Sequence, residues 1–122
     1  MNSLSSLDGI LAVQELLDRV ENDEELLAEL FLLFQEDMPG ARVALQLAIE
    51  GCDLPGIERA AHRLKGMLAN LSAKEAASLA AGIESAARAG DVSRVQQTMA
   101  AFAPLLVEIS SALNLFASGA AS

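Results

Sequence analysis

The chain contains one histidine, His62, and its surroundings point most clearly to chemistry. On a helix, Lys65 at i+3 and Gly66 at i+4 would lie on the same face as His62. Because helical side chains lean toward the N-terminus, a residue at i+4 would overhang the imidazole, and glycine leaves that space open. A glycine inside a helix costs about 1 kcal/mol relative to alanine, so its position needs a reason. The pattern predicts either an accessible imidazole beside a cation, suited to meeting an anion, or a surface histidine next to a glycine at which helices pack.

The signatures of common enzyme classes are missing from the sequence. It has no phosphate loop ending in Gly-Lys-Ser or Gly-Lys-Thr and no Gly-x-Ser-x-Gly elbow. One histidine and one cysteine, Cys52, can form neither a four-ligand zinc site nor an internal disulfide. We therefore expect no metal site, the missing motifs disfavour an independent enzyme, and we interpret Cys52 as a small apolar residue that fills space at a helix end.

The composition is typical of an all-α protein, because alanine and leucine supply 44 of the 122 residues. Apolar residues recur at helical spacing in five segments. Their expected limits are Ser6 or Asp8 to about Val20, Asp23 to Gly51, Asp53 to Leu71, Ser72 to Gly90, and Asp91 or Ser93 to beyond Leu113. The third segment would bury Ile57, Ala61, Leu64, Leu68 and Leu71, and the fifth Val95, Met99, Phe102, Leu106, Ile109 and Leu113. Ser72 is the expected N-cap of the fourth helix, with Glu75 completing a capping box.

Short gaps between long amphipathic helices favour antiparallel neighbours. We predict an antiparallel up-and-down four-helix bundle with an additional N-terminal helix packed at one end. The bundle would span residues 7–116, between a flexible N-terminus (1–6) and a flexible C-terminal tail (117–122). Pro39 and Pro104 fall inside the second and fifth segments, where we expect kinks.

The charge of the chain is strongly and unevenly negative, with eight Lys and Arg against seventeen Asp and Glu and a formal net charge of −9. Residues 1–58 hold thirteen acids and two bases, whereas 59–122 hold four acids and six bases. An acidic chain is a poor partner for nucleic acid or an anionic membrane surface. No apolar run is long enough to span a membrane, and the first residues lack the pattern of a secretory signal. We expect a cytoplasmic monomer.

The segment Ala61-His62-Arg63-Leu64-Lys65-Gly66, followed by Asn70-Leu71-Ser72-Ala73, resembles a known signature. It is similar to that of the histidine-containing phosphotransfer (HPt) domains of bacterial two-component phosphorelays, commonly His-x-Leu-Lys-Gly-Ser-x-x-x-Leu-Gly-Ala. The resemblance extends over nearly the whole chain, including 26–39 and 83–91. Two positions depart from the pattern: Met67 replaces a small Ser or Ala, and Ser72 replaces a Gly.

The resemblance implies a phosphorelay intermediate. His62 would accept a phosphoryl group from an aspartyl phosphate on a receiver domain and pass it to an aspartate on another receiver. Lys65 would steady the phosphoryl oxygens. The domain would have no ATP-dependent kinase activity of its own, and it would need no cofactor, because the receiver supplies Mg²⁺. Its partners would be response-regulator receivers and a sensor histidine kinase, with the chain either free-standing or a module of a hybrid kinase.

The resemblance also implies a partner for the imidazole. In many HPt domains a Glu or Gln that lies 22 residues beyond the histidine holds the second ring nitrogen, and here that position is Glu84. Glu84 could instead pair with Arg88 at i+4, and the two contacts can coexist. The expected docking surface for receivers comprises Arg59, Arg63, Gly66, Met67 and Ala69, although both arginines could simply be solvated charges. The alternative functions are a helical scaffold that docks a partner without being phosphorylated, and an independent enzyme.

Overall fold

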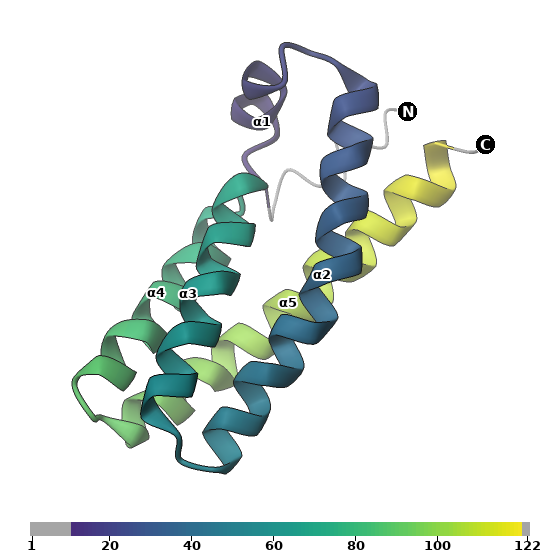
Figure 1. The fold of residues 1–122 in the computed structure, drawn as a ribbon. Helices are drawn as coiled ribbons and strands as arrows, with labels where there is room; N and C mark the ends of the chain where they lie inside the picture. The colour runs from purple at the N-terminus through teal and green to yellow at the C-terminus, as the bar shows by residue number, and fades with distance from the viewer. Residues whose placement is uncertain (1–10, 121–122) are drawn as a thin grey trace.

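A computed structural model describes residues 11–120 of the chain, which contain five helices and no strand (Figure 1). The helices are α1 (Val13–Arg19), α2 (Glu24–Glu50), α3 (Leu54–Asn70), α4 (Lys74–Arg88) and α5 (Val92–Ala120). The predicted all-α class is confirmed for this part of the chain. The expected N-terminus, 1–6, lies outside the described residues.

The four long helices lie side by side, and the chain reverses direction from each to the next (Figure 1). Helix α3 packs against α2 and α4, and α5 packs against α4 and α2. Helix α1 lies at one end, beside the turn between α3 and α4 (Figure 1). Pro39 and Pro104 both lie within continuous helices.

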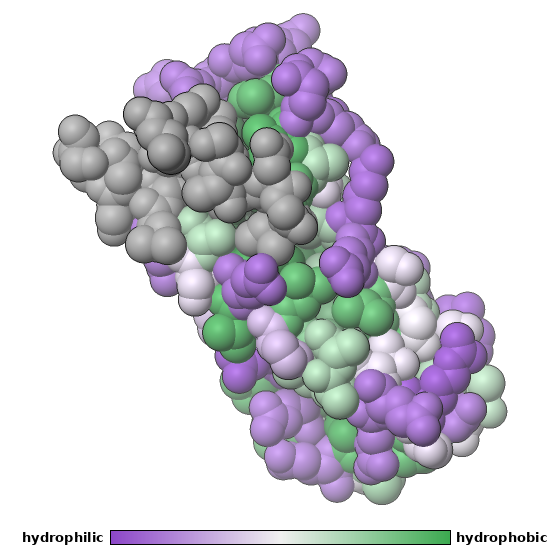
Figure 2. Space-filling model, turned by 180° about the vertical axis from the view of Figure 1, so that it is seen from behind, coloured by the Kyte–Doolittle hydropathy of each residue, from purple (hydrophilic) through white to green (hydrophobic). Residues whose placement is uncertain are grey.

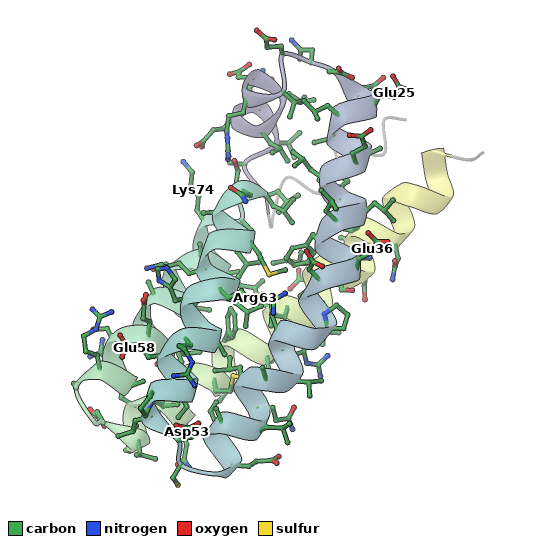
Figure 3. The ribbon with its side chains drawn as sticks, in the orientation of Figure 1. Glu25, Glu36, Asp53, Glu58, Arg63 and Lys74 are labelled. Carbon is green, nitrogen blue, oxygen red and sulfur yellow. The ribbon has the colours of Figure 1, made fainter. Side chains whose placement is uncertain are left out.

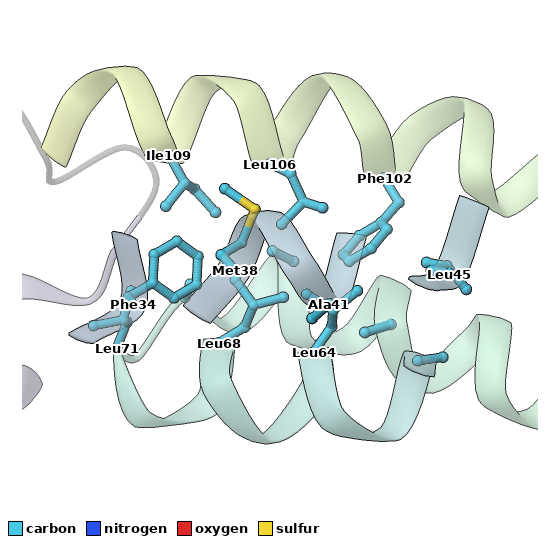
Figure 4. Close-up of a cluster of buried hydrophobic side chains, with 14 of the residues drawn as sticks. Phe34, Met38, Ala41, Leu45, Leu64, Leu68, Leu71, Phe102, Leu106 and Ile109 are labelled. Carbon is cyan, nitrogen blue, oxygen red and sulfur yellow. The ribbon is translucent and has the colours of Figure 1, made fainter. Parts of the chain in front are cut away.

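The core is built from one apolar face of each long helix (Figure 4). The five residues expected to be buried on α3 are all buried, and of the six on α5 only Met99 is half-buried. Burying a leucine or phenylalanine side chain stabilises the fold by about 1.5–3 kcal/mol, so these stripes fix how each helix is rotated. With Ala61, Leu64 and Leu68 facing the core, the opposite face of α3 must face outward. His62 lies on that outer face.

All four turns between helices are closed by the same pair of hydrogen bonds. The residue after each helix cap has a positive φ, and the following N–H donates to the carbonyl oxygen five residues back. The left-handed residues at this position are Glu21, Cys52, Ser72 and Gly90, and in the first turn Asn22 also has a positive φ. The bonds that span five residues run from the N–H of Asn22 to Leu17 O (2.8 Å), Asp53 to Ala48 O (2.9 Å), Ala73 to Leu68 O (3.0 Å) and Asp91 to Ala86 O (2.9 Å). These are Schellman turns, which satisfy the last carbonyl groups of a helix.

The N-caps of α2 and α3 are the predicted aspartates, and for α5 the structure selects Asp91 over Ser93. Asp23, Asp53 and Asp91 each accept a hydrogen bond from the backbone N–H three residues later, at 3.0–3.1 Å. Asp53 and Asp91 are also the last residues of the preceding turns, so one residue ends a helix and begins the next. This double use makes the connections short.

The predicted N-cap of α4 is wrong. Ser72 has φ +54° and occupies the left-handed position after α3, while Ala73 is the N-cap and makes no side-chain cap bond. Cys52 lies at the end of α2 as predicted, but it does not fill space there, because it is exposed and left-handed (φ +52°). Gly51 beside it has an ordinary φ of −87°. In both turns the hydrogen-bond pattern, and not the presence of glycine, determines which residue is left-handed.

Helix α1 is shorter than expected, because Leu11 and Ala12 precede it in non-helical conformation. Arg19 anchors it to the end of α3, donating from one guanidinium nitrogen to Ala69 O (3.0 Å) and Ser72 Oγ (3.2 Å). At the other end of the chain, the helical backbone of α5 continues to Ala120, past residue 116 where we ended the bundle. None of the described helices is apolar over a stretch long enough to span a bilayer. Seen from behind, polar and apolar residues are mixed over the surface (Figure 2).

Candidate functional site

His62 lies on the exposed face of α3, and 67% of its side chain is accessible. One turn later, a Cβ placed on Gly66 would meet no atom within 4 Å. The position of Gly66 therefore does not serve close packing between helices, which was one of the two explanations left open by the sequence. The space above the imidazole is open to solvent.

Glu84 on α4 joins His62 to Lys65. Its side chain is 9% exposed, and its carboxylate places Oε2 2.7 Å from His62 Nδ1 and Oε1 2.6 Å from Lys65 Nζ. Arg88, one turn further along α4, places a guanidinium nitrogen 3.4 Å from the same Oε2. Glu84 thus contacts both His62 and Arg88, which were the two alternatives for this residue. Lys65 is directed at Glu84 in this structure.

These contacts determine the protonation of the site. The hydrogen bond from Lys65 lowers the pKa of the Glu84 carboxyl below its ordinary value; burial opposes this effect, and the bond to His62 adds to it. Glu84 is therefore a carboxylate at neutral pH, and a carboxylate can only accept hydrogen bonds. It follows that Nδ1 of His62 carries the hydrogen. In a neutral imidazole with Nδ1 protonated, Nε2 has a free lone pair and is the nucleophilic atom.

A second ion pair lies one turn from the imidazole. Arg88 donates from Nε to Glu58 Oε2 (3.0 Å), and a terminal guanidinium nitrogen lies 2.9 Å from the same oxygen. With Pro55 and Arg59, these side chains and His62–Glu84 line a surface depression between α3 and α4. Sequence reasoning did not single out Glu58, although its position four residues before His62 on the same helix was a usable signal.

The residues expected to form a docking surface do not all lie on one edge of α3, because Arg59 also lines the depression beside His62. Figure 3 shows Glu58 on the edge of α3 that faces α4 and Arg63 on the edge that faces α2. Arg59 and Arg63 are exposed beside an apolar groove between α2 and α3 that includes Leu47. Half-buried Met67 lines a second hollow, further toward the end of α3. Ala69 is exposed, and its carbonyl oxygen accepts a hydrogen bond from the Arg19 guanidinium.

The site holds few metal ligands. Among residues 11–120, no three His, Cys, Asp or Glu side chains are grouped in a way that could hold a metal ion. What the arrangement offers chemically is one exposed imidazole nitrogen, oriented by a buried carboxylate, with Lys65, Arg59 and Arg88 and the acid Glu58 nearby.

Comparison with known proteins gives a family match. The family model described as Hpt domain matches residues 29–115, which contain most of α2, all of α3 and α4, and most of α5. No curated protein and no solved structure matches the chain.

Proposed function

The chain belongs to the Hpt domain family, and on this basis we propose that it is a phosphorelay intermediate phosphorylated on His62. Hpt domains are phosphocarriers and not kinases. The observation that most directly supports the assignment to His62 is the 2.7 Å contact between its Nδ1 and Glu84 Oε2. The rest of the His62 side chain is exposed. This arrangement leaves Nε2 available to an incoming phosphoryl group.

In the proposed reaction, the lone pair of His62 Nε2 attacks the phosphorus atom of a receiver's aspartyl phosphate. An N–P bond forms, the P–O bond to the aspartate breaks, and the aspartate leaves as a carboxylate. The ring becomes positively charged while Nδ1–H stays bonded to Glu84, whose negative charge stabilises it. Transfer to a second receiver runs the same steps in reverse. Phosphoryl transfer depends chiefly on positioning and charge stabilisation, which is why few protein groups suffice.

Lys65 is the proposed electrostatic partner of the phosphoryl group. Its ammonium is held by Glu84 at 2.6 Å, three residues from His62 on the same helix. A phosphoryl group on Nε2 brings oxygens with about two negative charges, which compete with Glu84 for this ammonium. Lys65 would then neutralise part of that charge while remaining near the carboxylate.

We further infer that α2–α5 form the antiparallel four-helix bundle, with α1 packed at one end; the packing of neighbouring helices supports this arrangement. Receiver domains and a sensor histidine kinase are the proposed partners, in the cytoplasm. The docking surface proposed for receivers comprises Arg59, Arg63, Gly66, Met67 and Ala69. Exposed arginines beside an apolar groove are complementary to a partner with an acidic pocket.

The test is a transfer assay with a panel of receivers that have been phosphorylated in the presence of Mg²⁺. We expect label on the wild-type chain, stable in alkali and lost in acid as for a phosphoramidate, and no label from ATP alone. His62→Gln should carry none, because the sequence has no second histidine. Label that persists in His62→Gln would refute the assignment to His62, and an unlabelled wild type across the whole panel would refute the proposal in favour of a scaffold.

A further inference from the structure

Four charged or polar side chains on α3 and α4 are linked by a chain of contacts that runs from His62 through Glu84 and Arg88 to Glu58. Glu58 and His62 are four residues apart on α3, and Glu84 and Arg88 are four residues apart on α4. Contacts between the helices join His62 to Glu84 and Arg88 to Glu58. The proposed transfer uses His62 and Glu84, but it gives no role to the other two members.

The position of Glu58 would allow it to compete for the free nitrogen of the His62 imidazole. A glutamate and a cation four residues apart on a helix attract one another and stabilise the pair by a few tenths of a kcal/mol. Glu58 could therefore pair with the protonated form of His62 and bond the ring nitrogen that Glu84 leaves free. Such a pair would favour the imidazolium ion, which has no lone pair with which to attack phosphorus.

In the described structure Glu58 is directed elsewhere. Its Oε2 receives two guanidinium nitrogens of Arg88, at 2.9 and 3.0 Å, and no hydrogen bond joins it to His62. Arg88 also reaches Glu84 at 3.4 Å, so it neutralises charge on both carboxylates near the ring. The other charged groups facing His62 are Lys65 and Arg59 on α3.

We propose that Arg88 is a positioning residue that holds Glu58 away from His62, so that the imidazole has one carboxylate partner and keeps its second nitrogen free. The consequence for phosphoryl transfer rests on the proposed function. The arrangement of the four side chains does not rest on it. The role of Arg88 and the proposed function can therefore be tested separately.

The first measurement is an NMR pH titration of the His62 ring, whose signals are unambiguous because the chain has one histidine. In Arg88→Gln, Glu58 is released, and the titration midpoint should rise by roughly 0.2–0.4 pH unit, the size expected for an i,i+4 ion pair. In the double variant Glu58→Gln/Arg88→Gln most of this rise should disappear, because the released carboxylate is gone, and the part that remains measures the loss of the Arg88 charge beside Glu84. In Glu58→Gln alone it should not rise.

The matched control is Arg94→Gln, which removes the same charge from an exposed position on α5. It should leave the midpoint unchanged. The second measurement is the transfer rate from a phosphorylated receiver. Arg88→Gln should slow transfer up to about twofold below the midpoint and have no effect at alkaline pH, since a shift of 0.3 pH unit halves the neutral fraction.

Two results would overturn the inference: a midpoint in Arg88→Gln equal to that of Arg94→Gln, or a rise of the same size in the double variant as in Arg88→Gln. A loss of packing cannot imitate the expected result, because removing Glu58 would not repair it. If no receiver labels the wild type, the proposed function fails, and the titration still decides the role of Arg88.

Discussion

Gly66 allows the stability of α3 and access to His62 to be changed separately. It is exposed to solvent and lies within α3, away from both helix ends, and a Cβ added to it meets no atom within 4 Å. Gly66→Ala therefore causes no clash and should stabilise the fold by about 0.8–1.0 kcal/mol, the difference in helix propensity. For a chain of this length, the corresponding rise in Tm is roughly 3–5 °C.

Gly66→Gln should gain part of this stability but should slow phosphoryl transfer by on the order of tenfold or more. A side chain at this position leans toward the N-terminus of α3, so the glutamine amide would lie over the imidazole of His62. A methyl group does not reach as far, and Gly66→Ala should transfer within about threefold of the wild type.

Thermal unfolding and single-turnover transfer from a phosphorylated receiver measure the two effects. Gly40→Ala is the control for stability, because Gly40 is also exposed within a helix and has nothing within 4 Å of its added Cβ. Ala101→Gln, exposed on α5, is the control for the added amide. The reasoning is refuted if Gly40→Ala is stabilised and Gly66→Ala is not, or if Gly66→Gln transfers as fast as Ala101→Gln.

Three further predictions concern the contacts around the site. Lys65→Ala should slow transfer in the same assay without abolishing it, because the nucleophile stays while one positive charge is lost; wild-type rates would contradict this. Because the pKa of Glu84 is lowered by folding, its stabilising contribution is complete above its ordinary value of 4.5 and is lost as the pH falls through the lowered value. The stability advantage of the wild type over Glu84→Gln in urea should therefore shrink below pH 4.5, and an advantage that grows there would reverse the sign of the argument. Arg19→Ala removes two hydrogen bonds to the end of α3, so hydrogen exchange of the Leu16 amide should accelerate while transfer is unchanged.

Much of the fold could be predicted because its determinants are local in the sequence. Periodic apolar residues gave the buried face of α3, and Asp23 and Asp53 marked two helix starts because a short acidic side chain can accept the free N–H groups there. Ser72 was misplaced for a physical reason, because serine is favoured both at helix N-caps and in turns. Only the hydrogen bonds of residues 72 and 73 to α3 show that it occupies the turn.

The site was only partly readable from the residues alone. His62 and Gly66 lie on one helix, so their spacing carried the signal. The contact between His62 and Glu84 joins two helices, and its expectation depended on resemblance to a family. The pairing of Glu58 with Arg88 also crosses from α3 to α4 and was missed, because helical spacing says nothing about which residues of neighbouring helices meet.

The Schellman turn between α3 and α4 fixes the number of residues that can separate His62 from Glu84. Only Leu71, Ser72 and Ala73 separate the two helices, and the N–H of Ala73 is already bonded to Leu68. One residue inserted within either helix would rotate everything beyond it by about 100° and advance it by about 1.5 Å, carrying Glu84 off the face that meets His62. Side chains along this stretch can be exchanged, but a residue cannot be added or deleted there without separating the imidazole from its carboxylate. The interval of 22 residues between His62 and Glu84 is thus itself a requirement of the site, independent of which residues fill it.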